Sequence, residues 1–176
     1  MKKIATTLTG VYLVELDIAL DERGSFQRLW GQDDLEELGL ERSLNNVGRS
    51  SNCSKGTVRG MHYQVAPHEE TKLVYCSLGR IFDIALDLRR DSPTFCEWFA
   101  VELAPDENMA LYIPQGVAHG FQTLEADSEV YYFISAKYHL ASSRGVRWND
   151  PAFRIELPLP VTVMNKRDGA YPDFVV

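Results

Sequence analysis

The sequence predicts an all-β fold, a sandwich or barrel of short strands, with a few short helices. The first observation behind this prediction is alternation: every even position from 82 to 88 is apolar, while Asp83, Asp87 and Arg89 occupy odd positions. That pattern is typical of a strand with one apolar face. The second observation is repetition, since similar runs, separated by turn signals, occur at 57–64, 72–79, 97–103, 109–113 and 129–138.

Helical and loop signals are few. A helix is predicted to start near Asp33, because Asp33 and Glu36 have the spacing of a capping box and three leucines follow at apolar positions between 35 and 40. Polar, loop-like composition predicts loops at 45–55 and 165–173. We expect the short helices to be minor additions to the strands.

The size and composition predict one globular domain over residues 1–176, long enough to bury a full core. Hydrophobic residues make up 45% and charged residues 24% of the chain. No apolar run approaches the roughly 20 residues of a membrane span. Residues 1–7 have a basic start, but polar residues interrupt any apolar stretch at once, so we expect a cytoplasmic protein without a membrane partner.

The formal net charge of −7 argues against nucleic acid as a partner, because such binding depends on basic patches. An anionic small ligand would therefore need a local cluster of arginine and lysine. The three cysteines, Cys53, Cys76 and Cys96, are odd in number and widely spaced. This predicts reduced thiols instead of a disulfide framework.

Two segments, 59–64 and 113–121, hold two of the four histidines. The second contains Pro114, Gly116 and His119 in the Pro-x-Gly-x-x-His spacing, which resembles the signature of the cupins, jelly-roll β-barrels also called double-stranded β-helices. Metal-binding cupins would carry His-x-His followed by glutamate in the first segment, whereas this chain has His62-Tyr63-Gln64. Glutamine is a poor ligand for transition metals, so we expect acid/base chemistry with no metal and no other cofactor.

Further motifs follow one another along the chain: Asp21-Glu22-Arg23-Gly24, Lys55-Gly56, Val58 to Gln64, Lys72-Leu73-Val74, Asp87-Leu88-Arg89, Ser92 to Phe95, Ile113 to Phe121, Trp148 to Pro151 and Lys166-Arg167-Asp168. From Asp21 to Asp173 the chain resembles the dTDP-4-dehydrorhamnose 3,5-epimerase family. These are metal-free cupins that act on nucleotide-linked 4-keto-6-deoxy sugars. The motifs are more specific for the family than for one sugar or nucleotide.

The resemblance implies a role for each catalytic group. In such a sugar the carbon-4 ketone makes the protons at carbons 3 and 5 removable, leaving an enolate that can be reprotonated on the opposite face. The resemblance assigns His62 as base, Asp168 as the carboxylate that orients it, Lys72 as the cation beside the enolate oxygen and Tyr132 as acid. By pattern alone, each residue has a structural alternative. His62 could be a hydrogen-bonded structural residue and Tyr132 a core-packing residue. Asp168 could be a solvated turn residue and Lys72 a charge at a strand edge.

The resemblance also implies substrate-binding residues: Arg23, Arg59, His119 and Arg167 at the diphosphate, with Phe26 and Tyr138 near the nucleotide base. Arginine suits this task because its planar fork binds phosphate oxygens in pairs. Strict alternation puts Arg59 and His62 on opposite faces of a strand, unless a bulge at Gly60 re-aims one of them. In the family, residues 23–26 reach a neighbour's site, so we expect a homodimer.

Some positions depart from the family pattern. Arg28 and Ser143 each occupy a place where glutamate is usual, and 47–49 replaces a Gln-x-Asn element. Glu70 replaces a common glutamine near Lys72. These exchanges predict that Arg28 and Arg49 contact the substrate, and that the nucleotide or sugar differs from the usual one, since arginine only donates hydrogen bonds where carboxylates accept them.

Three functions fit these observations. The first is a nucleotide-sugar epimerase acting at carbon 3, carbon 5 or both. The second is a related 3,4-ketoisomerase, which would move the ketone instead of inverting the ring carbons. The third is a sugar-nucleotide-binding cupin without catalytic activity, and the full set of base, cation and acid weighs against it. A metal oxygenase is disfavoured by the broken ligand set.

Overall fold

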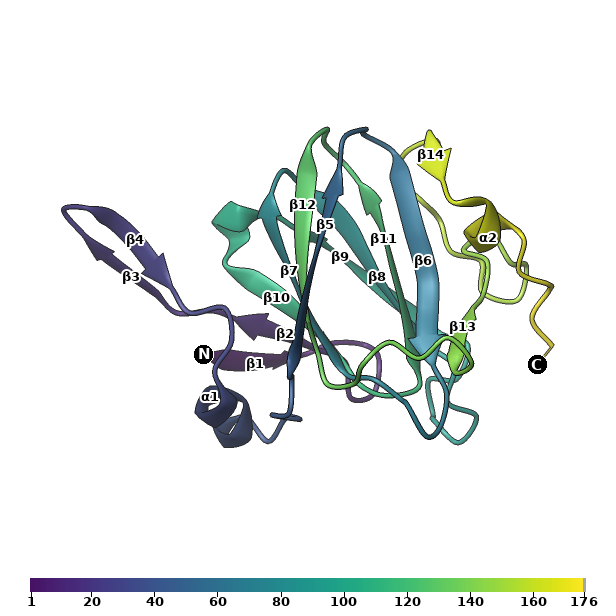
Figure 1. The fold of residues 1–176 in the computed structure, drawn as a ribbon, viewed down its shortest axis with the longest axis horizontal. Helices are drawn as coiled ribbons and strands as arrows, with labels where there is room; N and C mark the ends of the chain where they lie inside the picture. Colours follow the sequence, from purple (N-terminus) through teal and green to yellow (C-terminus); the bar gives the residue numbers. More distant parts are fainter. Residues whose placement is uncertain (176) are drawn as a thin grey trace.

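The computed structural model describes residues 1–175, which form a jelly-roll barrel of two facing β-sheets (Figure 1). The first sheet has the strand order β1 (Lys2–Ala5), β2 (Tyr12–Glu15), β10 (Met109–Ile113), β7 (Lys72–Leu78), β12 (Ser128–Ile134) and β5 (Asn46–Asn52). The second has the order β13 (Ser143–Gly145), β6 (Thr57–Gln64), β11 (Val117–Thr123), β8 (Ile81–Asp87) and β9 (Trp98–Leu103), and β14 (Val163–Met164) runs parallel to β6. The predicted all-β class is confirmed.

Smaller elements lie outside the two sheets. A hairpin of β3 (Ile18–Asp21) and β4 (Gly24–Gln27) projects away from the barrel (Figure 1). The helical elements are α1 (Gln32–Glu37), α2 (Lys166–Gly169) and a single 3-10 turn, η1 (Pro105–Glu107). Among the described residues no helix is long and apolar enough to cross a membrane.

Three apolar layers hold the barrel together. The central layer lies between the sheets and includes Val74, Leu111, Phe121 and Val130, all buried. A second layer packs α1 and the chain on either side of it, residues 29–44, against the first sheet, and a third packs the C-terminal segment against the second sheet. Because both sheets are covered on both faces, a strand such as β7 is an almost continuous buried run.

Strand β8 shows the effect of this double burial. Its predicted apolar face, with Ile84 and Leu86, packs outward against the C-terminal layer. The polar face does not reach solvent as alternation suggested, since Asp83 and Asp87 are both fully buried. Asp87 accepts hydrogen bonds from Arg89, Ser92 and Thr94, which offset its burial. Asp83 is bonded through Oδ1 to His119 Nε2, while its buried Oδ2 has no hydrogen-bond partner.

The sequence located most strands correctly, but two polar segments were misjudged. Strands were predicted at 57–64 and 109–113 with the bounds that β6 and β10 have, whereas the predicted strand 129–138 ends at Ile134. The loop predicted at 45–55 is wrong, because β5 pairs with β12 along its whole length despite its Asn, Gly and Ser content. Within 165–173, α2 forms, and the Asn165 side chain caps it by accepting a hydrogen bond from the Arg167 N–H.

Helix α1 begins at Gln32, close to the predicted start, but the predicted capping box is absent. Gly31 is the N-cap residue, and it offers no side-chain cap. The helix is instead fixed by Leu35, which is fully buried beneath the first sheet. Burial of one apolar side chain therefore replaces the expected cap as the local anchor.

Candidate active site

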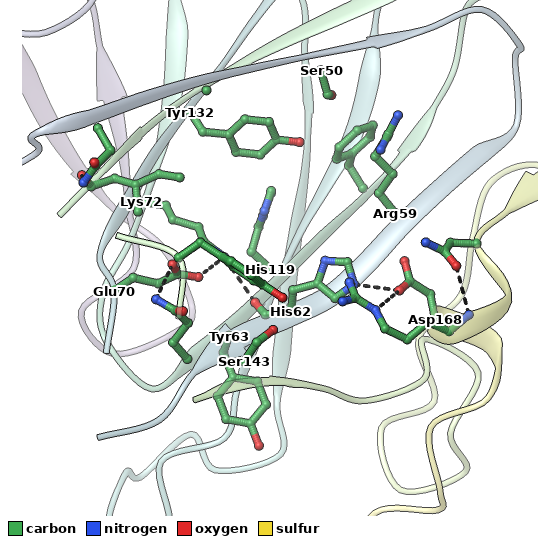
Figure 2. Close-up of a pocket in the computed structure, with 18 of the residues that line it drawn as sticks. Ser50, Arg59, His62, Tyr63, Glu70, Lys72, His119, Tyr132, Ser143 and Asp168 are labelled. Atoms are coloured by element: carbon green, nitrogen blue, oxygen red, sulfur yellow. Dashed lines mark hydrogen bonds and ion pairs between the residues drawn. The ribbon is translucent and has the colours of Figure 1, made fainter. Parts of the chain in front are cut away.

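A cavity of about 780 Å³ opens between the two sheets (Figure 2). Strands β5, β6, β7, β11 and β12 and the segment containing α2 form its walls. Eight of the residues predicted to be catalytic or substrate-binding line it: Arg59, His62, Lys72, His119, Tyr132, Tyr138, Arg167 and Asp168. Residues that are more than 100 positions apart in the sequence thus meet in one place.

A bulge in β6 brings Arg59 and His62 to the same cavity. His62 pairs with His119 and Arg59 pairs with Phe121, so β6 uses three steps where β11 uses two. The extra residue lies next to Gly60, which has a φ of +119°, and a side chain there would overlap with the backbone of Gly120. The bulge resolves the conflict between strict alternation and a shared site, as the glycine suggested.

His62 and Asp168 form a hydrogen-bonded pair. The Nε2 atom of His62 lies 2.8 Å from Oδ1 of Asp168, while Oδ2 accepts the Gly60 N–H at 3.2 Å. Burial alone would raise the pKa of Asp168, but the hydrogen bonds from His62 and Gly60 and the charge of Arg167 outweigh it and lower that pKa. An ionised Asp168 that accepts the Nε2 proton leaves Nδ1 as the basic nitrogen of His62.

Lys72 lies on β7 at the cavity wall and is almost completely buried. Its Nζ atom is 2.8 Å from Oε1 of Glu70 and 3.3 Å from the backbone oxygen of His62. The side chains of Lys72 and Glu70 are 9% and 11% exposed, so this is an ion pair largely removed from water. Glu70 was noticed in the sequence only as a departure, and its contact with the lysine could not be foreseen from their spacing.

Gln64 connects this ion pair to two loops. Its Nε2 atom donates to Oε2 of Glu70 at 3.1 Å and to the backbone oxygen of His68 at 2.9 Å. Its Oε1 atom accepts the backbone N–H of His139 at 2.6 Å. The residue that replaces a metal ligand in the cupin pattern is therefore a buried structural link.

Tyr132 enters the cavity from β12, facing β5. Burial is the main reason that its pKa is raised, and a hydrogen bond with Ser50 opposes the shift. Its ring meets the His119 ring edge-on, with 5.9 Å between centroids. His119 is itself buried and bonded through Nε2 to Asp83 at 2.7 Å, so that nitrogen is already engaged.

The inner face of β5 forms the wall that the sequence did not predict. Asn46, Gly48 and Ser50 line the cavity, and Asn52 accepts a hydrogen bond from Nε of Arg59 at 2.7 Å. Their alternation would have identified this face had the segment been recognised as a strand.

Arg49, the predicted substrate contact on this segment, lies on the opposite face of β5. It is 57% exposed and pairs with Glu129 at 3.3 Å. The register of β5 with β12 thus corrects the expectation that Arg49 faces the substrate. Ser143, another departure noted in the sequence, does line the cavity.

Three more predicted contacts lie away from the cavity of this chain. Arg23 and Phe26 belong to the projecting hairpin of β3 and β4, and the two side chains are well exposed. Arg28 lies beside a second, smaller cavity of about 250 Å³ and pairs with Asp34 at 3.4 Å. Within one chain, none of these three residues can contact a ligand held by His62.

The residues of the cavity do not fit a metal centre. Among residues 1–175 there is no group of three or more histidine, cysteine, aspartate or glutamate side chains arranged to hold a metal ion. The Nε2 atoms of His62 and His119 each face a carboxylate, and the Gln64 amide is bonded to the backbone. These donors and acceptors are therefore already engaged in hydrogen bonds with protein groups.

The jelly-roll barrel and its cavity define a cupin-type protein, and its family match places it among the isomerases. The chain belongs to the dTDP-4-dehydrorhamnose 3,5-epimerase family, whose sequence model matches residues 5–175. It is 36% identical to the dTDP-4-dehydrorhamnose 3,5-epimerase of Shigella flexneri, over 96% of this chain and 93% of the relative.

Solved structures agree with this assignment. The dTDP-4-dehydrorhamnose 3,5-epimerase of Bacillus anthracis, with TDP and PPi bound, superimposes with a TM-score of 0.94 at 35% identity, covering 98% of this chain and 99% of that one. The dTDP-6-deoxy-D-glucose-3,5-epimerase of Legionella pneumophila, in complex with dTDP-4-keto-L-rhamnose, gives 0.90 at 34% identity, with coverages of 96% and 90%.

Proposed function

We propose that this protein epimerises a nucleotide-linked 4-keto-6-deoxy sugar at carbon 3, carbon 5 or both, through an enolate. The observation that carries the proposal is the meeting of three groups in one cavity: the His62–Asp168 pair, the Lys72 ammonium and the Tyr132 phenol (Figure 2). Epimerisation next to a ketone requires a base, a stabiliser of the enolate oxygen and an acid, and these residues supply one of each.

The proposed reaction moves one proton at a time. Nδ1 of His62 takes the proton from the ring carbon, the electron pair of the C–H bond forms the enolate double bond, and the carbonyl electrons move to the carbon-4 oxygen. The Lys72 ammonium stabilises that oxygen as its charge grows. Tyr132 then donates a proton to the same carbon from the other ring face, and the electrons on the carbon-4 oxygen re-form the carbonyl. The protonated His62 and the Tyr132 phenolate return to their starting states by proton exchange with solvent. A tyrosine phenol is protonated at neutral pH, and burial, which raises the pKa of Tyr132 further, holds the proton until the carbanion takes it.

The diphosphate is proposed to lie against the basic residues of the cavity. Arg59 and Arg167 give this acidic protein the local positive charge that such a ligand needs. We assign His119 and Tyr138 to the same ligand, with His119 near the diphosphate and Tyr138 near the nucleotide base. The ligands of the two solved relatives, TDP with PPi and dTDP-4-keto-L-rhamnose, support a nucleotide-sugar substrate.

We also propose a homodimer. The hairpin exposes three large apolar side chains, with Ile18 at 44%, Leu20 at 75% and Phe26 at 68%. A second copy of the chain would cover this apolar surface and receive Arg23 and Phe26 beside its own cavity. The dimer would give both residues the substrate-binding role that they cannot perform within one chain.

The site is proposed to work without a metal, in a cytoplasmic protein. The hydrogen-bonded Gln64 in place of a ligand supports the first part. The three cysteines are all free, which supports a reducing compartment.

Proton exchange with solvent tests the proposal. The protein would be incubated in deuterated water with dTDP-4-keto-6-deoxyglucose and the product followed by NMR. We expect deuterium at carbon 3, carbon 5 or both, with inversion and with no loss of turnover on chelation. Migration of the ketone would identify a ketoisomerase, and binding without exchange would identify a protein that only binds the sugar nucleotide.

A further inference from the structure

The ammonium group of Lys72 has three N–H donors, and protein groups occupy two of them. One is directed to Oε1 of Glu70 and another to the backbone oxygen of His62. The third is left for the cavity, which Lys72 lines. Since an ammonium can rotate about its terminal bond, the two protein acceptors decide where the third donor points.

We infer that Glu70 is a positioning residue, which holds the Lys72 ammonium in the orientation that stabilises the enolate oxygen. The inference rests on the proposed function. Glu70 lies against the lysine within the cavity wall, and Figure 2 shows the two side chains joined beside the His62 backbone. The His62 carbonyl alone, at 3.3 Å, is the longer contact and leaves the ammonium free to swing around it.

Glu70 is itself fixed from the other side. Its second carboxylate oxygen, Oε2, accepts a hydrogen bond from Gln64 Nε2 at 3.1 Å. Gln64 is fully buried and is anchored to the backbone of His68 and His139. The carboxylate therefore has one oxygen for the scaffold and one for the lysine, which is the arrangement that a positioning group requires.

The charge of Glu70 has a cost as well as a use. A carboxylate 2.8 Å from the ammonium keeps a nearly buried cation paired, but it also repels the negative charge that develops on the enolate. The orientation of the Lys72 ammonium therefore comes from the hydrogen bond that Oε1 of Glu70 accepts, and the negative charge of Glu70 is not needed for that orientation. A glutamine at position 70 keeps one acceptor oxygen for Lys72 without the charge. Its amide nitrogen cannot accept from Gln64 Nε2, so that hydrogen bond is lost while Gln64 keeps its bonds to the backbone of His68 and His139.

The test compares Glu70→Ala and Glu70→Gln in the full-length protein with dTDP-4-keto-6-deoxyglucose as substrate. We expect Glu70→Ala to lower kcat at least about tenfold with KM within about twofold, because the lost interaction acts in the transition state. Glu70→Gln should restore kcat to within about threefold of the parent protein. Glu69→Ala, the adjacent carboxylate outside the cavity, is the matched control and should leave both constants unchanged.

A double-mutant cycle with Lys72→Met gives the decisive readout. If Glu70 acts through Lys72, Glu70→Ala should cause no further loss of kcat once the ammonium has been removed. An equal loss in both backgrounds would overturn the inference, as would a Glu70→Ala protein that matches Glu69→Ala. A parent protein that exchanges no deuterium would instead refute the proposed function, and with it the role of Glu70.

Discussion

The ring of Tyr171 occupies the space beside Gly145 that any side chain at position 145 would need. Gly145 pairs with His62 across β13 and β6, and Tyr171 follows α2, which carries Asp168. The contact thereby ties the strand next to the proposed base to the helix that holds its carboxylate partner. Packing outside the cavity contributes to the geometry inside it.

Substituting Gly145→Ala should therefore displace Tyr171 and shift α2. We expect the loss to appear in kcat, about tenfold, with a smaller change in KM, because the His62–Asp168 contact is disturbed while most of the cavity stays intact. Steady-state kinetics together with thermal unfolding would measure both effects. Tyr171→Phe keeps the ring and should behave as the parent protein, and equal losses in the two variants would contradict this explanation.

Replacing the proposed base, His62→Ala, should abolish deuterium exchange at both ring carbons, because the group proposed to remove the proton is gone. Asp168→Asn should cost less, since it removes only the carboxylate that selects the tautomer. NMR exchange rates give both values. Near-normal exchange in His62→Ala would show that the base has been misassigned.

Tyr132→Phe should separate proton removal from proton delivery. We expect exchange at carbon 3 or carbon 5 to persist in part while net inversion falls by about 10²-fold or more, the usual scale of a general acid. Product stereochemistry and deuterium content, measured on the same sample, distinguish the two steps. Equal loss of exchange and inversion would instead place Tyr132 in the first step.

Acid stability should depend on Asp87, which does not line the cavity. Burial would raise its pKa, but hydrogen bonds from Arg89, Ser92 and Thr94 outweigh it and lower the pKa to about 2. The folded state thus prefers the ionised carboxylate, a contribution of roughly 2 kcal/mol that is complete above the unfolded pKa near 4 and is lost as the pH falls through about 2.

The Asp87→Asn variant should lack this contribution, so its free energy of unfolding should vary less between pH 5 and pH 2. Urea titrations across that range would measure the slope. Asp91→Asn, on the exposed turn nearby, serves as the control. Parallel pH profiles for the parent and the Asp87 variant would refute this assignment.

The proposed dimer predicts the effect of Phe26→Asp on the exposed hairpin. A charge there should oppose apolar contact with a second copy, so we expect monomers at micromolar concentration and weakened substrate binding. Light scattering and calorimetry would report the two effects. A parent protein that is already monomeric and fully active would refute the dimer.

Alternation and turn residues were sufficient to predict the barrel, because most strands carry apolar residues for at least one covered face. They failed at β5, whose inward side chains are polar since they contact site residues instead of the core. They also misjudged Asp83 and Asp87, which looked solvent-facing. The partner of Asp83 is His119 on a distant strand, and those of Asp87 lie in the turn that follows β8, so alternation within β8 shows neither.

For the site, motif resemblance identified the groups that meet in the cavity, and Gly60 identified the bulge. The orientation of Arg49 could not be predicted, because it depends on the pairing of β5 with β12. The Glu70–Lys72 contact could not be predicted either. Alternation relates the directions of side chains only within a strand, and Glu70 lies in the loop before β7 begins. Register and loop geometry, which arise only from the assembled sheets, account for both failures.

Strand β5 is an edge of the first sheet, bonded to a neighbour on one side only. Yet its side chains also contact other residues of the site. Asn52 accepts a hydrogen bond from Arg59, and Ser50 is hydrogen-bonded to Tyr132. The wall of the cavity that is least constrained by the barrel is therefore one that faces the space proposed for the ligand. Evolution could revise it residue by residue, changing which sugar nucleotide is accepted while the base and its carboxylate, held on other elements, stay as they are.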